Sequence, residues 1–111
     1  MAAYTDLTID QGTDFETTFD LIGDDGEPID ITGYTFSGQI RKSYYSTNPT
    51  ANLSITIVSA VNGNTIIRLN AANTSNIISG RYVYDIKMKD TSNLVSRVVE
   101  GIVTVTPQVT K

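Results

Sequence analysis

Apolar and polar residues alternate along most of this 111-residue chain, and this period of two restricts its fold more than any other feature. In the stretch 14–21, Phe15, Phe19 and Leu21 occupy odd positions, and the even positions are polar. Successive side chains of a β-strand point to opposite faces of a sheet, so this stretch predicts a strand with one buried face. Comparable alternation predicts further strands over 4–9, 34–41, 53–57, 65–69, 81–89 and 94–106.

Turn-forming pairs separate these predicted strands. The Asp-Gly pair at 25–26 and the Asn-Gly pair at 62–63 suit tight turns. The one helical candidate is a short turn near residues 74–78, capped by Asn73 or Thr74. About seven strands with turns at intervals of about 8 to 12 residues are typical of an antiparallel β-sandwich. The sequence therefore predicts an all-β, immunoglobulin-like sandwich that forms a single domain over residues 1–111.

Two residues of the C-terminal half carry more detailed expectations. Tyr82 follows the predicted crossover between sheets, in the setting of the tyrosine corner, so we expect its hydroxyl to bond back to the backbone. Tyr84 stands where an immunoglobulin domain would have a cysteine, so the disulfide of that fold is missing. Gly101 marks an expected break in the final strand.

Charge is distributed unevenly along the chain. The formal net charge is −4, but the first thirty residues hold nine acids and no base, whereas all eight bases follow residue 40 with three acids. One interpretation is that acidic and basic strands pair within the fold. The other is a dipolar subunit whose acidic face packs against the basic face of a neighbour. An acidic chain argues against nucleic acid as the main partner under either interpretation.

The residue types of the chain restrict the chemistry that it can perform. It contains no histidine and no cysteine, which removes the commonest general base, thiol nucleophiles and thiolate metal ligands. The carboxylates within 24–27 could hold calcium, but they lack the spacing of an EF-hand loop. We expect no enzyme activity and no catalytic, cofactor or metal site. Without a secretory signal or an apolar run of membrane-spanning length, we expect a soluble chain made in a cytoplasm.

A loop over residues 42–52 contains the most conspicuous candidate for binding. Its adjacent tyrosines are surrounded by Ser, Thr, Asn and Pro, and exposed aromatic side chains can anchor an interface. The alternative is that the loop folds back and one tyrosine covers the end of the sandwich. With the neighbouring charged residues and the acidic turn, the candidate interface comprises Tyr44, Tyr45, Asp24, Asp25, Arg41 and Lys42.

The order of these motifs resembles a known group of proteins. The quoted segments are Leu7 to Gly12, Asp24 to Tyr34, Ser79 to Ile86 and Val99 to Pro107. They resemble small structural proteins of tailed bacteriophages, in particular the Ig-like modules near the N-termini of baseplate and tail proteins and their stand-alone relatives.

This resemblance implies a virion protein, made in the host bacterial cytoplasm. It would assemble with other virion structural proteins, in many copies or as a homo-oligomer, without contact to a membrane or nucleic acid. The start at Met1 and the short tail after Pro107 favour a complete small protein that decorates the capsid or belongs to the neck, tail or baseplate. A different hypothesis is a carbohydrate- or host-surface-binding module in which Tyr44 and Tyr45, with Tyr34, form a stacking platform.

Overall fold

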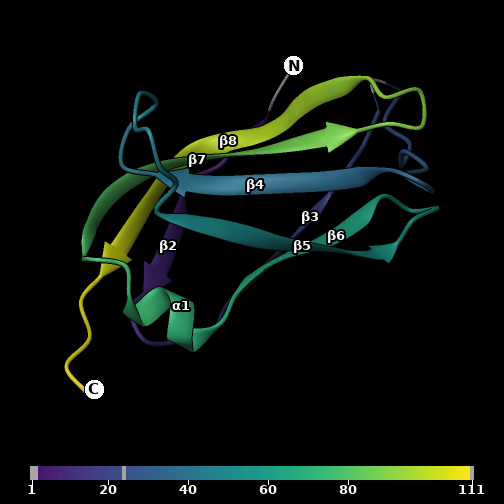
Figure 1. Cartoon of the computed structure of the whole chain (residues 1–111). Helices are drawn as coiled ribbons and strands as arrows, with labels where there is room; N and C mark the ends of the chain where they lie inside the picture. Colours follow the sequence, from purple (N-terminus) through teal and green to yellow (C-terminus); the bar gives the residue numbers. More distant parts are fainter. Residues whose placement is uncertain (1–2, 24, 111) are drawn as a thin grey trace.

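The structure is a computed structural model that describes residues 3–23 and 25–110. Strands account for most of its regular structure, and a five-residue helix lies between the sixth and seventh strands (Figure 1). The elements are β1 (Ala3–Tyr4), β2 (Leu7–Asp10), β3 (Phe15–Asp20), β4 (Thr35–Arg41), β5 (Ala51–Ser59), β6 (Asn64–Leu69), α1 (Ala71–Ser75), β7 (Gly80–Lys89) and β8 (Val95–Thr106).

The strands form one open, curled sheet in the order β1-β8-β7-β4-β5-β6-β3, with β2 also paired to β8. The prediction of an all-β, mainly antiparallel fold is confirmed, whereas two separate sheets were expected. The reason lies in β5, whose first residues pair with β4 and whose remainder, from Ser54 to Ser59, pairs with β6. One long strand thereby joins both halves of the sheet, and strand twist curls it into a half-barrel.

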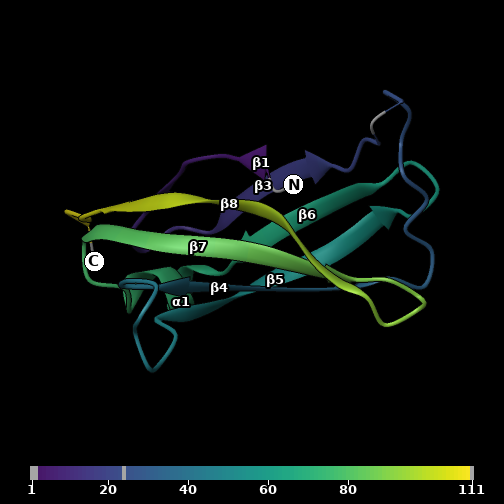
Figure 2. The same cartoon turned by 90° about the horizontal axis from the view of Figure 1, so that it is seen from above.

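The N-terminal strands are the exception to antiparallel pairing. Both β1 and β2 run parallel to β8, with Ala3 opposite Val99 and Leu7 opposite Val103. The predicted single strand over 4–9 is therefore divided, because residues 5–6 between β1 and β2 lie outside regular pairing. β3 is the opposite edge of the sheet, and Figure 2 shows that β1 and β3 lie on the same side of the molecule.

Alternation along the strands produces the core on the concave face. On β7, Tyr82, Tyr84 and Ile86 are buried, and the two residues between them are partly exposed. They pack with buried aliphatic side chains of β2, β4, β6 and β8. The Tyr82 hydroxyl donates to the backbone carbonyl of Ile78 at 2.5 Å, which confirms the expected bond back to the backbone.

The break predicted near Gly101 is wrong. β8 continues through Gly101, and its irregularity lies at Val98, between the pairs Ile86–Val99 and Lys87–Arg97. A glycine is needed at 101 for another reason, because a Cβ atom there would lie 2.0 Å from the carbonyl oxygen of Thr5. The segment between β1 and β2 passes directly over this glycine.

The helix begins earlier than the sequence predicted. Asn70 is its N-cap, and the Asn70 side chain accepts from the Asn73 amide at 2.9 Å. The prediction that Asn73 or Thr74 caps the helix is therefore wrong, because the side chain of Asn70 caps it about one turn earlier in the chain. Thr74 instead is buried, and its hydroxyl donates to the Thr13 carbonyl and accepts from the Gly12 amide. It connects α1 to the turn between β2 and β3.

Candidate interaction surface

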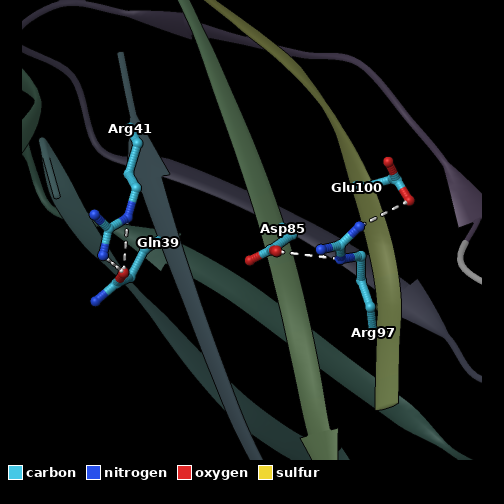
Figure 3. A network of polar contacts seen from close by, with 5 residues as sticks. All are labelled: Gln39, Arg41, Asp85, Arg97 and Glu100. Carbon is cyan, nitrogen blue, oxygen red and sulfur yellow. Dashed lines mark hydrogen bonds and ion pairs between the residues drawn. The ribbon is translucent and has the colours of Figure 1, made fainter. Parts of the chain in front are cut away.

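The outer, convex face of β4, β7 and β8 carries a network of charged and polar side chains (Figure 3). Arg97 on β8 contacts Asp85 on β7 at 3.2 Å and Glu100 at 3.6 Å. On β4, the Arg41 guanidinium donates to the side-chain oxygen of Gln39 at 2.8 and 3.3 Å. These groups are partly exposed, so each ion pair contributes only about 0–1 kcal/mol to stability. The network orders a polar surface more than it stabilises the fold.

Arg41 also holds the loop that follows β4. Its guanidinium donates to the Ser46 carbonyl at 2.6 Å, and the Ser43 amide donates to the Ser46 hydroxyl at 3.0 Å. The loop closes where the Thr50 amide donates to the Ile40 carbonyl at 2.7 Å. The loop is thus fixed at several points by hydrogen bonds within itself and to the end of β4.

The two tyrosines of this loop point away from the core. Tyr44 is 65% exposed and Tyr45 is 94% exposed, so neither covers the end of the sheet. Tyr44 helps to line a hollow of about 220 Å³ on the outer face, together with Arg41, Lys87 and Arg97. Lys42 lies beside them, with its ammonium group 4.6 Å from the centroid of the Tyr82 ring and 3.2 Å from the Arg81 carbonyl. Of the six predicted interface residues, Arg41 and Tyr44 therefore share this hollow, whereas the Lys42 ammonium group lies over the Tyr82 ring.

The remaining two predicted residues belong elsewhere. Asp24 lies outside the described residues. Asp25 belongs to the segment between β3 and β4, at the opposite end of β4 from the tyrosines, and its carboxylate accepts from the Glu27 amide at 3.0 Å. This bond holds a tight turn. The sequence suggested one interface, but Asp25 is not part of the surface around Tyr44.

The structure separates the acidic and basic parts of the chain only in part, because Asp6 and Asp10 lie beside β8. Six of the eight bases lie on β4, β7 and β8 or directly after β4, whereas the N-terminal acids follow β2, β3 and the adjoining segments. Of the acids before residue 31 that the structure describes, only Glu16 forms an ion pair, with Arg68 at 3.0 Å. Ion pairs within the described part of the fold therefore account for little of the charge split.

A second concave feature was missed by sequence reasoning. A groove of about 580 Å³ opens between the free edge of β3 and the β1–β2 segment. Ala3, Thr5 and Leu7 line one side and residues 17–23 line the other, over a floor that includes Ile67 and Val99. Alternation marks β3 as half-buried, but only strand pairing shows that β3 is the edge of the sheet.

Tyr84 connects this groove to the core. Its hydroxyl donates to the Thr5 carbonyl at 2.5 Å, and so fixes the segment that crosses Gly101. Burial, followed by the negative charge of Asp6, raises the pKa of Tyr84 to about 12. The Asp6 carboxylate accepts from the Ile102 amide at 3.1 Å, which ties the same segment to β8.

Among the residues that the structure describes, no group of three or more His, Cys, Asp or Glu side chains is arranged to hold a metal ion. Across those same residues, no helix is long and apolar enough to cross a membrane.

The chain matches no protein-family model and no curated protein sequence. Among solved structures, it is similar to part of an internalin-like protein of Listeria monocytogenes, with a TM-score of 0.52 and 17% identity over 95% of this chain. It is also similar to part of a family 123 glycoside hydrolase from Clostridium perfringens, with a TM-score of 0.45 and 12% identity over 98% of this chain. The chain spans 28% and 24% of those two proteins. The first likeness shows a shared fold alone, and the second is too distant to carry an argument.

Proposed function

We propose that this chain is a structural protein of a tailed phage that assembles with other virion proteins as a capsid-decorating, neck, tail or baseplate component. The observation that carries the assembly role is the exposed tyrosine pair on a hydrogen-bonded loop, beside a face rich in bases. Aromatic side chains and arginine dominate the energetics of protein interfaces, and a loop already held in place loses little entropy on binding.

Charge separation supports contacts between subunits. Six of the eight bases lie on β4, β7 and β8 or directly after β4, and most of the N-terminal acids lie on β3 and the segments on either side of it. Such complementary surfaces steer association and fix the orientation of partners. In this proposal the chain occurs in many copies or as a homo-oligomer, and it is made in the host bacterial cytoplasm. The proposal assigns it no catalytic role, nucleic-acid partner or membrane partner.

The phage setting rests on the resemblance of its turns and strand starts to the Ig-like modules of tail and baseplate proteins. The immunoglobulin-like classification belongs to the same proposal. Its support is the bond from the Tyr82 hydroxyl to the Ile78 carbonyl, the arrangement of a tyrosine corner.

The experiment compares particles that carry Tyr44→Ala with Tyr45→Ala to particles that carry Leu94→Ala. Leu94 is the matched control because it is 66% exposed and lies in the turn between β7 and β8, at the other end of β7 from Lys42. Immunoblotting of washed particles measures the copies retained. We expect the double variant to fall about tenfold or more, the factor for 1.4 kcal/mol, and Leu94→Ala to match the wild type. Full retention of the double variant would exclude the loop as the interface.

A carbohydrate- or host-surface-binding module is the second candidate, favoured by the same exposed tyrosines. The platform would consist of Tyr44 and Tyr45 alone, because Tyr34 precedes β4 and the pair follows it, about 23 Å apart along the strand. A glycan array probed with the wild type and with the double alanine variant tests this candidate. This carbohydrate-binding candidate requires that the wild type bind a glycan on the array and that the double alanine variant fail to bind it.

A further inference from the structure

The groove beside β3 has the features of a binding site for an extended peptide segment. We propose that a segment of another virion protein, with alternating apolar and basic residues, adds to the free edge of β3 as a further strand and fills the groove. This inference rests on the proposed assembly role, for which it names a partner chemistry. Its first support is the groove itself, about 580 Å³ in volume, with an apolar floor and an edge strand as one wall.

The edge of β3 has backbone groups available for such pairing. The Leu21 amide donates to the Gly63 carbonyl at 2.9 Å, and the same register continues through Phe19 opposite Thr65. Because bonding alternates along an antiparallel pair, the odd residues of β3 bond to β6. The N–H and C=O groups of Glu16, Thr18 and Asp20 therefore point to the free edge. A row of unpaired backbone groups is the template for β-strand addition.

Incomplete burial around the groove indicates that something further covers it. Phe19 on β3 lines the groove and faces the core side, yet it is only half-buried. Ile22, which also lines the groove, is 61% exposed. An added strand beside β3 would place every second side chain over this apolar surface. Those positions of the partner segment would accordingly be apolar.

The charges at this edge determine the other positions. Asp20 is the one charged residue among those that line the groove. Glu16 and Asp20 are exposed on the outer side of β3, where Glu16 pairs with Arg68 and Asp20 accepts a hydrogen bond from the Asn64 side chain. Asp20 has no basic partner in the part of the chain that the structure describes. Opposite charges on directly facing strand residues are stabilising, and like charges are destabilising. The alternate side chains of the partner segment would therefore be Lys or Arg.

A different protein fits this description better than a second copy. Within the described residues, β4, β6, β7 and β8 each lie between two other strands, although residues 95–98 of β8 pair with β7 alone. The base of that open segment, Arg97, is already held by Asp85 and Glu100, so among the described strands it offers β3 no unpaired base. The occupant is consequently a segment from another protein of the particle.

The test places a photo-cross-linking residue, benzoylphenylalanine, at Ile22 on the rim of the groove, within assembled particles. We expect a cross-link to another virion protein, in a segment where apolar and basic residues alternate. A cross-link to a second copy of this chain, to a segment without that alternation, or to no protein would overturn the inference.

Two substitutions at Thr18 then test pairing with the edge directly. Thr18→Pro removes an amide that points away from β6, so the fold keeps its ladder, whereas Thr18→Ala keeps that amide. We expect the proline variant to reduce the cross-link about tenfold, the factor for 1.4 kcal/mol, and the alanine variant to leave it nearly unchanged. Equal cross-linking by a folded proline variant would refute strand addition. If the wild-type chain is retained in particles but the Ile22 probe gives no cross-link, only the proposed binding of a strand in the groove is refuted. If the wild-type chain is absent from particles, the proposed function itself is refuted.

Discussion

Gly101→Ala is the substitution whose effect follows most directly from the geometry. The new Cβ atom would lie 2.0 Å from the Thr5 carbonyl oxygen, and real Cβ atoms essentially never approach another atom within 3.0 Å. Because the obstacle is backbone, the segment between β1 and β2 must move by about 1 Å. Overpacking of this kind costs about 1–3 kcal/mol. That movement would also strain the bond from the Tyr84 hydroxyl to the same carbonyl.

Thermal unfolding followed by circular dichroism measures the cost. For a domain of this size, 1 kcal/mol corresponds to about 4 °C, so we expect Tm to fall by about 4–12 °C. Hydrogen exchange should locate the effect, with faster exchange at the Thr5 and Ile102 amides, which bond to Glu100 and Asp6 respectively. Gly23→Ala is the control, because its new Cβ would meet only the movable Asp25 side chain closely, at 3.1 Å. An unchanged Tm for Gly101→Ala would refute the described path of the N-terminal segment.

Three further substitutions test other contacts of the fold. Tyr84→Phe should cost about 1 kcal/mol, measured by urea unfolding, because the bond to the Thr5 carbonyl is lost. The pKa of Tyr84 is near 10 in the unfolded chain and about 12 in the folded one, so the unfolded state is favoured as the pH rises from 10 to 12. The wild type should therefore lose up to about 1.4 kcal/mol of unfolding free energy per pH unit in that interval. An equal loss in Tyr84→Phe would show that Tyr84 is not the group responsible. Thr74→Val keeps the shape of the side chain but removes its bonds to Thr13 and Gly12, so urea unfolding should show a loss of about 1–3 kcal/mol, and a neutral result would exclude this clamp. Asn70→Ala removes the helix cap and should cost about 1 kcal/mol in the same assay, whereas Asn73→Ala should cost less if Asn70 is the cap.

Local patterns in the sequence were sufficient to predict most of the strands. The alternation over 81–89 depends only on which face each side chain occupies, and Tyr82, Tyr84 and Ile86 are buried as that pattern indicated. Likewise, Tyr44 and Tyr45 are exposed because the loop around them offers no apolar partners.

Features that depend on contacts between distant residues were predicted less well. The need for glycine at position 101 depends on Thr5, which is far away in the sequence, so the local pattern around Gly101 wrongly predicts a strand break. The single curled sheet depends on β5 pairing with both β4 and β6, and no local pattern encodes that choice of neighbours. The groove beside β3 was missed for the same reason, because an edge strand and a central strand can show the same alternation of apolar and polar residues.

The proposed assembly into a phage particle can be measured by quantitative mass spectrometry of purified, washed particles, with the major capsid protein as the internal reference. We expect a fixed copy number, either in the hundreds for a capsid decoration or a small multiple of six for a neck, tail or baseplate component. Loss of the chain from washed particles would contradict the proposed assembly role.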